Sequence, residues 1–104
     1  MILRSWRGCT RTSDADAYVA FLHATVLPEI EAIGGHGAYV LRRDHETTSE
    51  FWVLSLWDSM DAVRRFAGPN PEEAVVPAEA QLLLLDFDPF AHHYQVLHAP
   101  DFLS

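Results

Sequence analysis

The chain has 104 residues, 49% of them hydrophobic, and a formal net charge of -8 with only seven Lys and Arg. This size and apolar fraction predict a single globular domain. The negative charge argues against binding to nucleic acid or to an anionic membrane surface, because both need a basic patch. The single cysteine, Cys9, cannot form an internal disulfide. The lone cysteine and the absence of an apolar, signal-like run at the N-terminus together favour a reduced, cytoplasmic setting.

The first predicted strand covers residues 2–9 and is unusually polar, so we expect one of its faces to meet a cavity or a partner. A helical period of apolar residues follows and reaches Ile33. Ser13 and Asp16 form a capping-box-like start for this helix. Pro28 lies inside the helix and predicts a kink or break near residues 24–27. Gly34 is expected to end it.

A strand over residues 36–43, a polar turn over 44–49 and a strand over 51–57 predict a hairpin. Asp58 and Ser59 offer consecutive N-caps for a second helix, which Gly68 should stop. Residues 70–76 predict a short helix ended by Pro77. A strand over 82–87 is then interrupted at residues 88–89 and resumes over 90–97. Residues 1–98 therefore form one predicted domain, with a tail over 99–104.

The order of predicted elements is β-α-β-β-α-β. This order indicates an α+β, ferredoxin-like fold with helices on one face of an antiparallel sheet. The other face retains apolar residues that no element of the same chain covers. A second, identical sheet is the simplest cover, so we expect a homodimer.

Several stretches carry a family resemblance: LSLWDSMDAVRRFAG, NPEEAVV and LLLLDFDPFAHHYQVL, supported by ILRSWRG and GAYVLRR. Together they resemble the antibiotic-biosynthesis-monooxygenase (ABM) superfamily of dimeric α/β-barrel proteins. The resemblance implies a homodimer whose two sheets form a barrel, with one pocket per subunit between sheet and helices. Members include cofactor-free monooxygenases that oxidise polycyclic phenols to quinones, and haem-degrading monooxygenases.

The haem-degrading branch has an asparagine, a tryptophan and a haem-ligating histidine at three positions where this chain has Trp6, Phe66 and Val76. Valine cannot ligate iron. The sequence therefore disfavours ordinary haem degradation, and we predict no cofactor and no metal site.

His92 and His93 are the candidate catalytic residues. Adjacent residues on a strand point to opposite faces, so only one of them can face a given pocket. That histidine could act as a general base near neutral pH, or it could have a purely structural role. We favour His93 for the pocket and expect His92 on a better-packed face with Tyr94, although the interruption at residues 88–89 could reset the register.

The candidate substrate-binding residues are aromatic, apart from one arginine. Trp6 and Trp57 could stack on a flat ring or could simply fill the core. Tyr39 could donate a hydrogen bond to a ligand, and Phe66 could form part of the wall. Arg42, like the other strand arginines, could bind a carboxylate or a developing oxyanion, or form an ion pair.

The leading functional hypothesis is a cofactor-free oxidation of a small apolar or aromatic molecule, in which a histidine deprotonates the substrate before it reacts with oxygen. Two alternatives stay open. One is a dimer that binds a small molecule without chemistry. The other is an isomerase or cyclase on the same fold, in which the histidine only moves protons.

Overall fold

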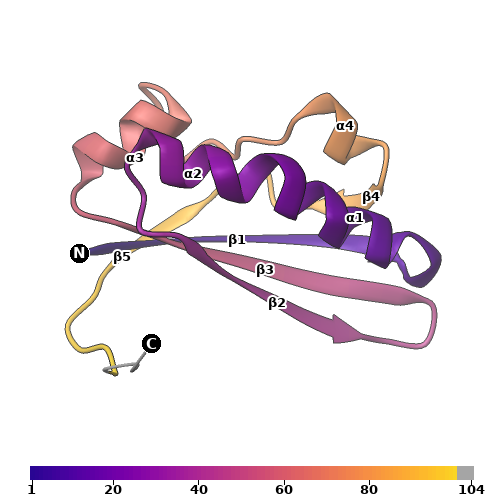
Figure 1. Ribbon diagram of the computed structural model, residues 1–104. Coiled ribbons are helices and arrows are strands. Elements are labelled where there is room, and N and C mark those ends of the chain that lie inside the picture. The colour runs from indigo at the N-terminus through magenta and orange to yellow at the C-terminus, as the bar shows by residue number, and fades with distance from the viewer. Residues whose placement is uncertain (101–104) are drawn as a thin grey trace.

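The computed structural model describes residues 1–100, and it contains one antiparallel sheet with helices on a single face (Figure 1). The strands are β1 (Ile2–Arg11), β2 (Ala38–Asp44), β3 (Thr48–Trp57), β4 (Leu84–Phe87) and β5 (His92–Gln95). The helical elements are a 3-10 turn (Thr12–Asp14), α1 (Ala15–Phe21), a π-helical stretch (Leu22–Val26), α2 (Leu27–Ile33), α3 (Met60–Ala67) and α4 (Ala78–Gln81). The predicted tail, residues 99–104, falls largely outside the described residues.

The sheet order is β2-β3-β1-β4, and β5 also pairs with β1. β4 pairs with the second half of β1, from Gly8 to Thr10, whereas β5 pairs with the first half, from Ile2 to Ser5. β4 and β5 therefore occupy one edge position, interrupted at residues 88–89 as the sequence predicted. This topology confirms the α+β, ferredoxin-like fold class.

The long first helix contains the break that Pro28 predicted. Residues Leu22–Val26 form a π-helical stretch between α1 and α2. A proline has no N–H to donate to the preceding turn, so the hydrogen-bond ladder shifts in register just before it. Gly34 ends α2 with φ 110°, a left-handed conformation that glycine adopts without strain. The expected cap by Ser13 is wrong: α1 begins without a side-chain cap, because a 3-10 turn precedes it.

The junction from β3 to α3 has the geometry that the sequence predicted. Ser59 is the N-cap, and its Oγ accepts a hydrogen bond from the backbone N–H of Ala62 at 3.2 Å. Gly68 ends the helix. This short connection lays α3 back over the sheet and brings Phe66 above β1.

The short helix predicted for residues 70–76 is not formed, and α4 begins only after Pro77. Backbone carbonyl groups of this segment instead accept hydrogen bonds from residues that are distant in sequence. The carbonyls of Pro71 and Glu73 accept hydrogen bonds from Arg4, and the carbonyl of Glu72 accepts one from the N–H of Ala91. These long-range bonds take up groups that a local helix would need, and they hold the segment beside β5.

The two faces of the sheet differ sharply. The helix-covered face holds the fully buried residues of β3, including Phe51 and Trp57. The opposite face, hereafter the open face, is not covered by any helix of residues 1–100 (Figure 1). Exposed apolar side chains on it include Tyr39, Leu41 and Trp52 at 45%, 47% and 38%. Within the described residues, no helix is long and apolar enough to cross a membrane.

Candidate functional site

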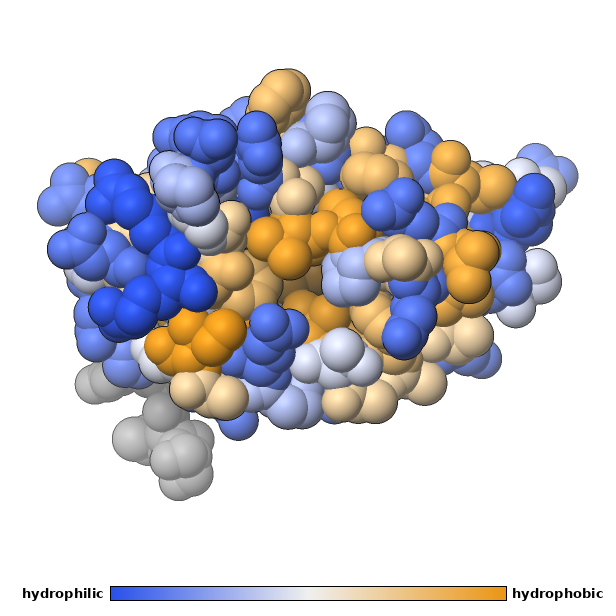
Figure 2. Space-filling view, turned by 90° about the horizontal axis from the view of Figure 1, so that it is seen from above, coloured by the Kyte–Doolittle hydropathy of each residue, from blue (hydrophilic) through white to orange (hydrophobic). Residues whose placement is uncertain are grey.

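A cavity lies between the helix-covered face of the sheet and the helices. Figure 2 shows apolar surface gathered around a hollow on this side of the molecule. The cavity measures about 50 Å³, which is small beside the roughly 300–1,000 Å³ of typical ligand sites. Its lining comes from four regions: the long helix (Tyr18, Phe21, Leu22, Val26, Ile30), the sheet (Arg4, Trp6, Val53, Ser55), α3 (Phe66), and the segment leading into α4 with α4 itself (Val75, Val76, Pro77, Ala80).

Arg4 is the one charged residue of this lining. It lies on β1 and is only 4% exposed. Its guanidinium donates hydrogen bonds to the carbonyls of Pro71 and Glu73, and its carbon lies 5.9 Å from the centre of the Phe66 ring. Burial lowers the pKa of Arg4 to about 10, although the charge of Glu72 partly offsets this effect. The side chain thus places a positive charge at the wall of an otherwise apolar cavity.

His93 lies directly beside Arg4, because the two residues face each other across the β1–β5 pair. Its Nε2 is 2.9 Å from Nη1 of Arg4. An arginine can only donate, so Nε2 must accept and the ring proton must lie on Nδ1. Burial and the charge of Arg4 lower the pKa of His93. His93 is therefore neutral near pH 7, and it contacts the cavity through Arg4 rather than lining it directly.

Trp6 forms part of the cavity wall, and its orientation is fixed at both ends. Its Nε1–H donates to the carbonyl of Asp88 at 2.8 Å. The far edge of the ring folds over Gly8, where a Cβ would lie only 2.7 Å from the indole. A side chain at this position would push Trp6 out of place, so the missing Cβ of Gly8 allows the ring to lie flat along the sheet.

Phe66 lines the cavity, and Trp57 packs against the Phe66 ring on its core side. The two rings pack with centroids 5.3 Å apart. Trp57 is fully buried and donates from Nε1 to Oγ of Ser55 at 2.9 Å. Trp57 is thus a core residue in contact with a lining residue, and it does not itself reach the cavity in this structure.

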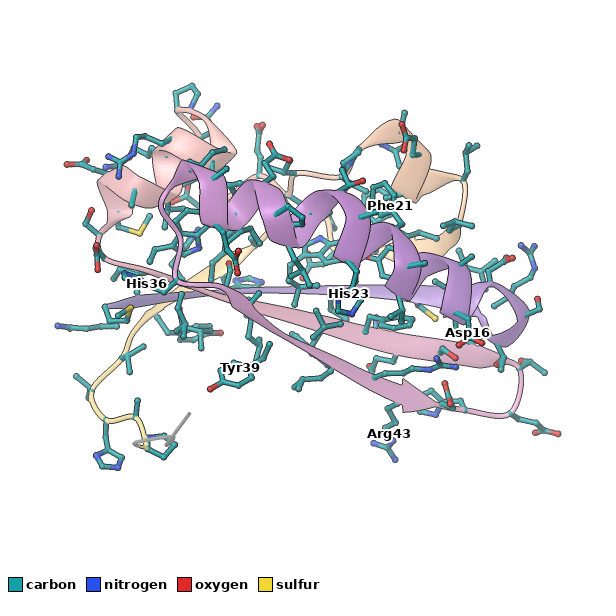
Figure 3. The ribbon with its side chains drawn as sticks, in the orientation of Figure 1. Asp16, Phe21, His23, His36, Tyr39 and Arg43 are labelled. Atoms are coloured by element: carbon teal, nitrogen blue, oxygen red, sulfur yellow. The ribbon has the colours of Figure 1, made fainter. Side chains whose placement is uncertain are left out.

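Three other predicted site residues lie away from the cavity. Tyr39 is on the open face, where Figure 3 shows it pointing away from the helices. His92 also lies on the open face, with an exposed side chain whose Nε2 is 3.6 Å from a carboxylate oxygen of Asp88. The well-packed surroundings expected for His92 are absent in the described chain, because the neighbouring Tyr94 is 57% exposed.

Arg42 faces the helices but sits at the far end of β2. It donates to Asp16 at 2.9 Å and to Asp44 at 2.8 Å, and it does not reach the cavity. Figure 3 shows Asp16 at the beginning of α1, beside this end of the sheet. These contacts match the ion-pair alternative that the sequence left open for Arg42.

The sequence did not single out Tyr18 as a cavity residue. Tyr18 is 1% exposed, and burial raises the pKa of its hydroxyl well above the ordinary value. Its position could have been found from spacing, because Tyr18, Leu22, Val26 and Ile30 recur every four residues and form one stripe along the helix.

Among residues 1–100, no group of three or more His, Cys, Asp or Glu is arranged to hold a metal ion.

The comparison with solved structures gives a match over the whole chain. A crystal structure from Bacillus cereus, described as a "putative antibiotic biosynthesis monooxygenase", aligns with a TM-score of 0.64, covering 100% of this chain and 98% of that one. The chain shares the overall fold of that structure. At 14% identity the match establishes this fold and nothing finer. No family model matches the sequence, and no curated protein matches it.

Proposed function

We propose that this ABM-fold protein binds a small, electron-rich aromatic molecule in the cavity between sheet and helices, and that it oxidises this molecule with O2 without a cofactor. The observation that carries the proposal is the composition of the cavity wall. Trp6 and Phe66 offer ring surfaces, and the Arg4–His93 pair supplies polar chemistry beside them. Large rings with a few placed polar groups are typical of sites that orient flat ligands.

The chemistry assigned to His93 is removal of one proton. A neutral imidazole can accept the proton of an acidic phenol or of an activated ring CH2 group, which requires that the ligand displace Arg4 from the Nε2 lone pair of His93. The resulting electron-rich anion then reacts with O2 directly. In the net reaction, a ring CH2 group and O2 become a ring C=O group and water, so O2 is the only oxidant. The low pKa of His93 keeps it in the base form at neutral pH.

The cavity must widen for a ring system to enter, because about 50 Å³ holds only a few water-sized groups. Residues 74–77 form neither helix nor strand, and Val75 is 43% exposed beside the cavity. We expect this segment to move outward when the ligand binds.

A second candidate is binding without chemistry. One contact favours it: Arg4 already occupies the Nε2 lone pair of His93. If this contact persists in the complex, His93 cannot accept a proton from the ligand, and the protein acts as a carrier or sensor.

Oxygen uptake with a panel of hydroxyanthrones tests the oxidation. We expect chelator-treated protein to consume one O2 per quinone formed, and His93→Ala to abolish turnover. His92→Ala is the matched control, because His92 lies on the open face, and it should leave turnover unchanged. Tight binding without oxygen uptake would support the binder. Product formation without oxygen uptake would instead indicate an isomerase or cyclase.

We also propose that two copies pair through the open face. Exposed rings and aliphatic side chains gather there, among them Leu41 and Trp52. Contiguous apolar surface of this kind usually marks an interface, and identical faces can pair around a two-fold axis. Light scattering should give a mass near twice 11.7 kDa, and Leu41→Glu should give a monomer. A stable monomer of the unmodified chain at micromolar concentration would contradict the pairing.

A further inference from the structure

Arg4 differs from four other arginines of the chain, which form ion pairs with carboxylates. Arg7, Arg11, Arg42 and Arg64 each have a carboxylate oxygen within 4.0 Å. Arg4 is buried, yet within residues 1–100 it has no carboxylate at ion-pair distance, and its partners are two carbonyl groups and a neutral imidazole. Among residues 1–100, this buried positive charge therefore has no neutralising carboxylate partner.

Burying an unpaired charge raises the free energy of the folded protein, and a purely structural role would not need a charge at this position. Removing a charge from water is unfavourable unless an opposite charge accompanies it. A neutral donor could hold the carbonyls of Pro71 and Glu73 without that cost. The lowered pKa of Arg4 reflects the same cost, since burial outweighs the distant charge of Glu72.

The guanidinium also has donor capacity left. Its three hydrogen bonds within residues 1–100 use three of the five N–H groups that an arginine carries. Arg4 belongs to the cavity lining, so this capacity lies next to the space that a ligand would fill. A planar guanidinium suits an oxygen anion, because N–H groups with a fixed geometry can donate to it together.

We infer that Arg4 is an anion-recognition residue, and that the cavity selects aromatic ligands bearing an anionic oxygen, such as a carboxylate, phenolate or enolate. The inference rests on the proposed binding function and names its ligand class. The charged oxygen would meet Arg4, and the ring would lie against Trp6 and Phe66. The present volume of about 50 Å³ accommodates only the anionic group, so the ring enters when residues 74–77 move outward, as in the proposed function.

Calorimetric titration with 2-naphthoate and 2-naphthamide tests the inference, because these molecules share one shape and differ in charge. We expect the protein to bind the acid at least about tenfold more tightly than the amide, since charge-assisted hydrogen bonds are roughly twice as strong as neutral ones. Arg4→Gln should remove this preference while keeping affinity for the amide. Arg4→Lys, which keeps the charge and serves if the glutamine variant does not fold, should retain part of it.

Arg43→Gln is the matched control. It removes the same charge from the open face, where Figure 3 shows Arg43 pointing away from the helices, and it should leave the preference intact. Equal binding of acid and amide by the unmodified protein would overturn the inference, as would an unchanged preference in Arg4→Gln. Binding of neither ligand would overturn both the inference and the proposed function. A clear preference for the acid without oxygen uptake on hydroxyanthrones would refute the oxidation alone.

Discussion

Ser55→Ala tests the buried contact that supports the cavity wall. The indole N–H of Trp57 donates a hydrogen bond to Oγ of Ser55 at 2.9 Å, and Ser55 and Trp57 are 4% and 0% exposed. Removing the hydroxyl leaves a buried donor unpaired, which costs about 1–3 kcal/mol. For a domain of about 100 residues, each kcal/mol corresponds to roughly 4–8 °C in melting temperature.

The assay is a double-mutant cycle of urea unfolding with Trp57→Phe, which removes the donor. In that background Ser55→Ala should cost nothing or should stabilise slightly, because the serine hydroxyl has itself lost its partner. The two substitutions should therefore couple by about 1 kcal/mol or more. An equal loss in both backgrounds would refute the reasoning, since the hydroxyl would then matter for a reason unrelated to the indole.

Three further predictions concern stability, each measured by urea unfolding. Ser59→Ala removes the side-chain cap of α3 and should cost about 1 kcal/mol; no change would mean that the cap is not formed in solution. Gly35→Ala should cost about 1–3 kcal/mol, because the new Cβ would lie 2.5 Å from Cγ2 of Ile30; a neutral result would show that the packing there is looser. The pKa of His93 is lowered from 6.5 in the folded state, so its neutral form stabilises the fold above that pH, and this contribution is lost as the pH falls below it. His93→Gln should therefore flatten the loss of stability between pH 7 and pH 5; an unchanged slope in this variant would contradict the placement of His93 beside Arg4.

The fold was predictable because its signals are local. Pro28, Gly34, Ser59 and Gly68 each determine the backbone within a few residues, and the structure has the π-helical stretch, the helix ends and the cap at those places. The segment over residues 70–76 looked equally local but was predicted wrongly. Its carbonyls bond to Arg4 and Ala91, which are distant in sequence, and no local pattern reveals such partners.

The site was less predictable than the fold, because lining a cavity depends on which elements pack together. Strand alternation was enough to separate His93 from His92, and β5 keeps that alternation in its pairing with β1. Alternation could not show that Tyr39 lies on the face opposite the cavity, because that depends on which side of the sheet the helices cover. Sequence could not separate Arg4 from the other strand arginines for a related reason. Within the part of the chain that the structure describes, Arg4 is buried with no carboxylate at ion-pair distance, and this appears only in three dimensions.

The tryptophan indole resonances offer the most direct test of the cavity as the ligand site. The chain has three tryptophans, and each reports on a different place: Trp6 on the cavity wall, Trp57 in the core behind Phe66, and Trp52 on the open face. Two-dimensional ¹H–¹⁵N spectra recorded during a titration with 2-naphthoate should show the largest shift for Trp6, a smaller one for Trp57 and none for Trp52. A dominant shift of Trp52, or no shift of Trp6 at saturation, would contradict the account.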